Sequence, residues 1–89
     1  MDLVTTADVR TYTTTETRDG VSYSAMLTVS AGHCTEVVFN ANMEVIHEAD
    51  FPASNISGAD RDEYTRVMLS SVLDARRRAL TRAGNNEPS

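Results

Sequence analysis

The chain contains no lysine and no tryptophan, and among its 89 residues it has a single cysteine and two prolines. One thiol, Cys34, cannot form an intrachain disulfide, so the sequence predicts a reducing compartment. The first residues show neither a basic leader nor an apolar run of signal-peptide length, and no stretch is long enough to cross a membrane. We therefore expect a cytoplasmic protein with no membrane partner.

The sequence also lacks any catalytic or metal-binding fingerprint. Its one concentration of chemically active side chains comprises His33, Cys34, Glu36 and His47. A cysteine nucleophile needs a neighbouring imidazole, and a metal site needs three or four converging ligands, but the spacing of these residues is typical of neither. We expect no enzymatic activity, no bound metal and no cofactor.

The length sets a further limit on function. A chain of 9.7 kDa has room for one compact domain. We place that domain at residues 1–84 and a frayed C-terminal tail at residues 85–89. A core of this size leaves little space for an enclosed substrate cavity, so the length favours a function carried out at the surface.

Charge is distributed unevenly along the chain. Residues 1–50 contain eight carboxylates and two arginines, whereas residues 51–89 contain five carboxylates and six arginines. The formal net charge is −5 and the sequence pI is near 4.8. No motif identifies a partner, but this asymmetry does favour one kind, because the acidic first half of the chain can attract a basic surface.

Residues 8–18 hold five threonines and one tyrosine without glycine or proline, a composition typical of a strand. Asp19-Gly20 follows directly, and such a pair between two strand-like runs predicts a two-residue hairpin. With Arg18 opposite Val21, the apolar residues of the second strand share one face at a period of two. That face comprises Val21, Tyr23, Ala25, Leu27 and Val29.

Two further strands are predicted at residues 36–40 and 43–48, which completes a four-stranded meander. The loop at Gly32 can hold two or three residues, and a change of one residue there exchanges the faces of Val37 and Val38. The sequence leaves this register open.

That register decides whether four apolar side chains lie on the outer side of the sheet or in the core: Met26, Val37, Phe39 and Ile46. In one register they form an apolar patch on the sheet face away from the helix, which is a natural dimer or partner surface. In the other register much of this patch joins the core.

After a linker at residues 51–56, the sequence predicts a helix over residues 58–83. Ser57 and Asp60 have the spacing of a capping box, and Gly84 stands where a left-handed C-cap is expected. The helix should cover the sheet with a stripe of apolar residues: Tyr64, Met68, Leu69, Val72, Leu73, Ala75, Ala79, Leu80 and Ala83. The predicted fold is thus α+β, a four-stranded antiparallel β-meander with one long C-terminal helix packed on one face.

The leading functional hypothesis is a non-enzymatic inhibitor that binds a basic surface of a protein partner. Carboxylates along strands and turns can imitate nucleic-acid phosphates and occupy a basic groove. By analogy of size and charge, the most concrete version is an anti-CRISPR-type protein from a phage or mobile element. The residues expected on this acidic surface are Glu16, Asp19, Glu36, Glu44, Glu48 and Asp50.

Two alternatives remain open. The first is a homo-oligomeric regulatory or structural module that dimerises through the outer sheet face. The second is a minimal nucleic-acid binder in which arginines near the end of the helix contact phosphates. Its candidate anion contacts are Arg76, Arg77, Arg78 and Arg82. Successive residues on a helix point about 100° apart, and the net charge of −5 argues against nucleic acid as the partner.

Overall fold

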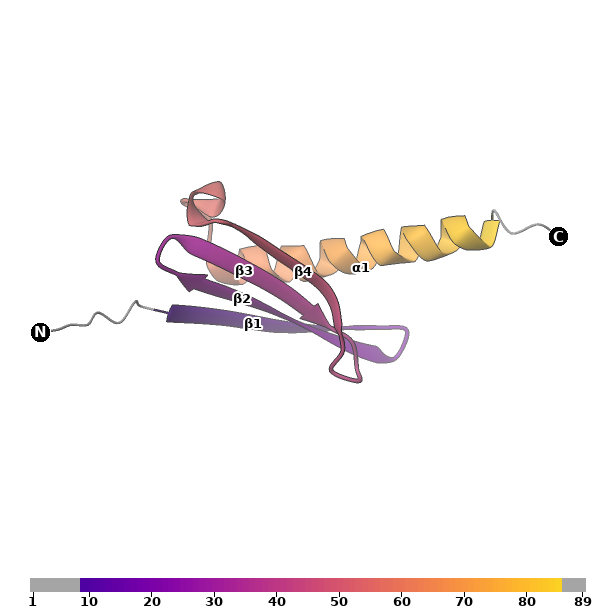
Figure 1. Cartoon of the computed structure of the whole chain (residues 1–89). Helices are drawn as coiled ribbons and strands as arrows, with labels where there is room; N and C mark the ends of the chain where they lie inside the picture. The colour runs from indigo at the N-terminus through magenta and orange to yellow at the C-terminus, as the bar shows by residue number, and fades with distance from the viewer. Residues whose placement is uncertain (1–8, 86–89) are drawn as a thin grey trace, which may run out of the picture.

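The computed structural model describes the backbone of residues 9–85 and the side chains of residues 9–81. Four antiparallel strands form one sheet in the order of the sequence, and one long helix packs on one face of it (Figure 1). The elements are β1 (Val9–Arg18), β2 (Val21–Ser30), β3 (His33–Phe39), β4 (Val45–Pro52), the 3-10 helix η1 (Ala53–Ile56) and α1 (Arg61–Asn85). The predicted α+β meander with a C-terminal helix is confirmed. Apart from Asn85, which belongs to α1, the predicted tail lies outside the described residues.

The first hairpin forms in the predicted register. Asp19 and Gly20 have φ angles of 53° and 79°, and this pair of positive values defines a type I′ turn that matches the twist of the strands. Arg18 lies opposite Val21, and the pairing continues to Val9 opposite Ser30. The local turn signal therefore determines the register of both strands over their full length.

The second hairpin has a two-residue loop, Ala31-Gly32, which also has two positive φ angles, of 51° and 78°. This left-handed conformation destabilises an alanine by about 1 kcal/mol or more, because its Cβ approaches the following carbonyl oxygen. The loop pairs Ser30 with His33, and this register directs Val38 into the core and Val37 outward. The structure thereby establishes the register of the third strand, which the sequence left open.

Strands β3 and β4 pair with a bulge between Val38 and Phe39. In the turn that joins them, the Asn40 side-chain oxygen accepts hydrogen bonds from the backbone N–H groups of Asn42 and Glu44, both at 2.9 Å. Strand β4 continues to Pro52, so the prediction of a linker from residue 51 is wrong at its start. The strand is longer because it pairs with β3 as far as His33.

Helix α1 begins three residues later than predicted, and its cap differs from the predicted one. Gly58 lies in a turn with a φ of 82°, so it cannot be the first helical residue. The Asp60 carboxylate accepts a hydrogen bond from the Glu63 backbone N–H at 3.1 Å, which makes Asp60, and not Ser57, the N-cap. At the other end α1 continues through Gly84 to Asn85, so the predicted C-cap at Gly84 is also wrong.

Within the described residues, the core contains two clusters between the sheet and the helical segments η1 and α1. One contains Ala25, Val38, Met68, Leu69 and Leu73. The other contains Leu27, Val29, Cys34 and Ile56, and it lies where η1 closes the end of the sheet. Tyr64 packs against both clusters and lies 6.0 Å from Phe51 between ring centroids, so it joins the two halves of the core.

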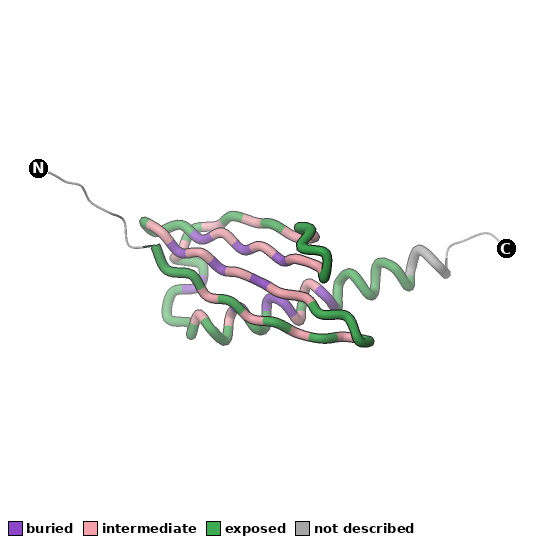
Figure 2. The backbone as a smooth tube through the Cα atoms, turned by 90° about the horizontal axis from the view of Figure 1, so that it is seen from below, coloured by how far each residue is buried: buried purple, intermediate pink, exposed green. Residues whose placement is uncertain are grey.

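The final turns of α1 extend beyond the sheet (Figures 1 and 2). Every residue from Asp74 to Thr81 is exposed, and Leu80 keeps 69% of its surface accessible. Ala75, Ala79 and Leu80 were expected on the buried stripe, and that expectation is wrong for them. By Asp74 the helix has reached the tip of the first hairpin, where it contacts Arg18, so no strand remains beneath the following turns. Ala83 belongs to the same predicted stripe, but its side chain lies outside the described part.

Candidate functional site

The sheet face opposite α1, here called the outer face, carries no covering layer in the described part of the chain. Strand alternation brings threonines and serines of β1 and β2 to it, together with alternate residues of β3 and β4. Its central residues in β2 and β3 are half-buried by their neighbours on the same face. One side of the sheet is therefore covered by α1, and the other side is uncovered in the described part of the chain.

The centre of the outer face is apolar. Met26 lies directly opposite Val37, and Phe39 follows two residues further along β3. A hollow of about 330 Å³ lies beside Met26 and Phe39, where Thr13 of β1 and Met43 of the following turn border it. Ile46 was predicted in the same patch, but it packs against the core cluster on the helix side, because the bulge at Val38 and Phe39 shifts its position on β4.

Two carboxylates border this apolar centre along β4. Glu48 pairs with Val37 across the strands and Asp50 pairs with Thr35, so both lie on the outer face. The Thr35 hydroxyl donates a hydrogen bond to Asp50 at 2.8 Å, which orients that carboxylate. Glu44 lies exposed in the turn that leads into β4 and accepts a hydrogen bond from the Asn40 side chain at 2.8 Å. Three of the six predicted acidic residues thus follow one edge of the sheet.

No arginine lies on the outer face in the part of the chain that the structure describes. Arg18 of β1 contacts α1, and alternation places Arg10 on the same side of the sheet. The other six arginines of the chain follow residue 60 and belong to α1. Among the described residues, the edge of the outer face therefore carries carboxylates without arginine, whereas the helix side carries both arginines and carboxylates.

The three remaining predicted acidic residues do not belong to that edge. Glu36 is buried, with 7% of its surface exposed, because its position on β3 faces α1. Glu16 also faces the helix side, where it binds Arg18. Asp19 lies in the β1–β2 turn. Glu36 and Glu16 are corrections to the predicted acidic surface, since alternation along the strand turns their carboxylates inward.

Glu36 organises a polar cluster under the helix. The Tyr64 hydroxyl donates to one carboxylate oxygen at 2.5 Å, and the His47 Nε2 lies 2.6 Å from the other. His47 and Glu36 meet diagonally across the strands, since Glu36 pairs with Ala49 and His47 pairs with Val38. The sequence did not indicate the contribution of Tyr64, because its position on an apolar helical stripe predicted only a core residue. A buried carboxylate with a partner at each oxygen is a satisfied structural group.

The thiol of Cys34 lies close to this cluster and is fully buried. Burial raises the pKa of the thiol, Glu36 raises it further, and the positive charge of Arg61 opposes both. The pKa of Tyr64 is also raised, first by burial and then by its hydrogen bond to the Glu36 carboxylate. Both groups therefore keep their protons at neutral pH. A protonated, enclosed thiol is a poor nucleophile, so the geometry does not support chemistry at Cys34.

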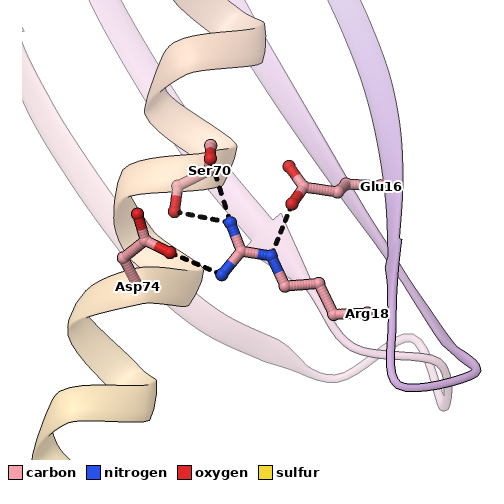
Figure 3. A network of polar contacts seen from close by, with 4 residues as sticks. All are labelled: Glu16, Arg18, Ser70 and Asp74. Carbon is pink, nitrogen blue, oxygen red and sulfur yellow. Dashed lines mark hydrogen bonds and ion pairs between the residues drawn. The ribbon is translucent and has the colours of Figure 1, made fainter.

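A second polar network joins the first hairpin to α1 (Figure 3). The Arg18 side chain crosses from β1 and donates to the Asp74 carboxylate at 2.6 Å and to the Ser70 hydroxyl at 2.9 Å. Its Nε donates to Glu16 on the same strand at 2.5 Å. These contacts raise the pKa of the guanidinium. The sequence pattern does not predict this network, because Arg18 is 52 residues from Ser70 and 56 residues from Asp74 in the chain.

The predicted arginine run is divided by the helix. Arg76 and Arg77 line a groove between α1 and the first hairpin, whereas Arg78 does not. All three are exposed. The side chain of Arg82 lies outside the described residues. The three adjacent arginines therefore form no single patch, as expected from their angular spacing.

Among residues 9–85 no helix is long and apolar enough to span a membrane. Across the same range no three histidine, cysteine or acidic side chains are arranged to hold a metal ion. Comparison of the chain with protein-family models, curated proteins and solved structures finds no match.

Proposed function

We propose that this protein is a non-enzymatic, cytoplasmic inhibitor that binds another protein through its outer face. The observation that carries the proposal is the composition of that face: an apolar centre of Met26, Val37 and Phe39 beside the carboxylates of Glu48 and Asp50, with no arginine among its described residues. Apolar centres with a charged rim are typical of protein interfaces. Residues of one sign of charge select a partner of the opposite sign.

The partner surface that fits best is basic, such as a groove that binds nucleic acid. Glu44, Glu48 and Asp50 follow one edge of the sheet and can stand in for a short run of phosphates. An inhibitor of this kind works by occupation and needs no active site. Anti-CRISPR-type and related anti-defence proteins of phages and mobile elements provide the functional model, by analogy of size and charge.

The test is affinity capture from a bacterial lysate at low salt and at about 0.5 M salt, with the bound proteins identified by mass spectrometry. We expect a basic, nucleic-acid-handling protein that is lost at high salt. The double variant Glu48→Gln/Asp50→Asn should reduce its capture at least fivefold. The matched control Asp62→Asn/Glu63→Gln also removes two exposed carboxylates, but from α1, and should leave capture unchanged.

A captured target must then lose its nucleic-acid binding when the inhibitor is added at equal concentration. Equal capture by the two double variants would contradict the role of the outer face. A target that binds nucleic acid unhindered in the complex would contradict inhibition.

The same face supports a second candidate, a homodimeric regulatory or structural module. Met26, Val37 and Phe39 are apolar and face outward, and a second copy could cover them. Such a dimer should persist at 0.5 M salt, because apolar contacts are not screened. Sedimentation of the pure protein distinguishes the candidates: Val37→Glu should convert a dimer of this kind to a monomer, whereas the inhibitor is monomeric from the start.

A further inference from the structure

A groove lies on the helix side of the molecule, remote from the outer face. It has a volume of about 320 Å³ and separates the tip of the β1–β2 hairpin from the projecting turns of α1. Val21 and Tyr23 line it from β2, and Leu73 and Leu80 line it from α1. Val21 and Leu80 are 40% and 69% exposed, so much of this apolar wall is open to solvent.

Two guanidinium groups border the apolar wall. Arg76 and Arg77 line the groove and are exposed, and no carboxylate in the described part of the chain forms an ion pair with either. Arg18 differs from them, because Glu16 and Asp74 already neutralise it. Asp19 of the β1–β2 turn also lines the groove, so the lining holds one carboxylate beside Arg76 and Arg77 and keeps a net positive charge. Arginine forks bind carboxylates in a bidentate manner.

The partial enclosure of the groove favours a ligand that extends beyond it. Sites for small molecules usually enclose most of the ligand, but this groove is only partly enclosed. Figure 1 shows that α1 extends past the hairpin. Single-stranded nucleic acid is bound on several stacked aromatic rings, whereas the described residues that line this groove include one aromatic side chain, Tyr23. Aliphatic walls beside arginines instead complement a peptide that carries both aliphatic and acidic side chains.

We propose that the groove binds an acidic peptide segment of a partner protein, anchored by a large aliphatic side chain. The aliphatic side chain packs between Val21 and Leu80, and carboxylates next to it accept hydrogen bonds from Arg76 and Arg77. This site is separate from the outer face and does not depend on the function proposed there. The molecule then has two binding surfaces with opposite charge preferences.

The experiment is a titration of the ¹⁵N-labelled protein with the synthetic peptide acetyl-Asp-Glu-Leu-Leu-Asp-Glu-amide at about 0.1 M salt, followed by NMR. We expect saturable shifts of the backbone amides of residues 18–23 and 73–81. Arg77→Gln should weaken binding at least fivefold. Arg78→Gln is the matched control, because it removes the same charge one residue away and outside the groove, and it should change affinity less than twofold.

The aliphatic anchor has its own matched pair. Leu80→Ser should weaken binding at least threefold, whereas Val67→Ser, at a helix position that is 54% exposed and outside the groove, should leave it unchanged. All four substituted residues are exposed, so the variants should fold. A peptide with serine in place of both leucines should bind at least fivefold more weakly.

Three results would overturn the proposal. The first is the absence of saturable shifts at the groove up to millimolar peptide. The second is an equal loss of affinity in Arg77→Gln and Arg78→Gln, or equal binding of the serine peptide, which would indicate unspecific attraction of negative charge. The third is tighter binding of a ten-nucleotide oligothymidine at the same amides, which would assign the groove to single-stranded nucleic acid.

Discussion

At the scale of single residues, the buried carboxylate of Glu36 organises the polar contacts between the sheet and α1. It accepts a hydrogen bond from Tyr64 and meets His47, so three elements converge on one side chain. An ionised group in a core is tolerated only when its oxygens have partners. The cluster is therefore a point where small chemical changes should have large effects on stability.

Glu36→Ala should lower the free energy of unfolding by about 2–3 kcal/mol, because it leaves the Tyr64 hydroxyl and His47 without their acceptor. Urea denaturation at pH 7 measures this change. Glu48→Ala removes the same side chain from an exposed site on the neighbouring strand and should cost no more than about 0.5 kcal/mol. Similar losses in the two variants would show that Glu36 is not an organising contact.

The raised pKa values of Cys34 and Tyr64 predict a loss of stability in alkali. In the unfolded chain these groups release their protons near their ordinary pKa values of 9.0 and 10.0, whereas the folded protein holds the protons to higher pH. Above pH 9 the unfolded state therefore binds fewer protons, and the free energy of unfolding falls as pH rises. The double variant Cys34→Ala/Tyr64→Phe should show a shallower decline between pH 9 and 11 in urea titrations. A decline as steep as that of the parent protein would refute the assignment.

At the scale of elements, each junction depends on a few polar contacts at the ends of strands and helices. Asp60 caps α1, Asn40 closes the β3–β4 turn, and Arg18 fastens the first hairpin to the helix. Backbone donors at a helix start and in tight turns have no partner within the element, so side chains from adjoining residues satisfy them.

The N-cap assignment gives a direct comparison of two residues. Asp60→Ala should destabilise the protein by about 1 kcal/mol, since the Glu63 backbone N–H loses its acceptor. Ser57→Ala should have almost no effect, although the sequence pattern alone predicts the opposite order. Thermal unfolding followed by circular dichroism ranks the stability of the two variants. A larger loss of stability in Ser57→Ala than in Asp60→Ala would support Ser57 as the N-cap.

The Arg18 network should hold the end of the hairpin against α1. Arg18→Met removes the contacts with Glu16, Ser70 and Asp74 and should lower the urea midpoint, with a smaller decrease when salt is added. Arg66→Met is the matched control, because Arg66 lies 3.6 Å from Glu63 in a pair that is exposed on both sides. An equal shift in the two variants would mean that the network is no more than an ordinary surface pair.

At the scale of the whole molecule, the single-layer sheet and the projecting helix leave two surfaces open. The outer face is acidic at its edge and apolar at its centre, and the groove by α1 has more arginines than carboxylates in its lining. A molecule of net charge −5 therefore carries a local positive site. Under the two proposals, electrostatic attraction at each surface selects a partner of different charge.

The unsupported turns of α1 should be less stable than the rest of the helix. Residues 65–73 contain the buried contacts of α1, whereas residues 75–81 are exposed throughout. Hydrogen–deuterium exchange of the isolated protein should show amides at 75–81 exchanging at least tenfold faster than those at 65–73. Uniform protection along the helix would be incompatible with exposed final turns and would indicate that another copy covers them.

The sequence by itself determined the elements that depend on neighbours in the chain. Asp19-Gly20 specified the first hairpin and its register, and the alternation of Ala25 and Leu27 with polar residues identified the core face. These features are local, because a turn of two residues aligns the strands on either side of it. The order of the elements then leaves few ways to arrange four strands and one helix.

Only the tertiary structure decided which charged residues are available to a partner. Glu36 and Glu48 are alike in the sequence, yet one is buried beneath Tyr64 and the other lies on the outer face. The loop at Gly32 decides which residues of β3 face the helix. The bulge between Val38 and Phe39 shifts the pairing of β4 and so changes which of its residues face outward. The end of burial along α1 also depends on the length of the first hairpin. The face on which a strand residue lies and the length of helix that the sheet covers both depend on contacts between segments distant in the chain. Short sequence patterns therefore do not predict them.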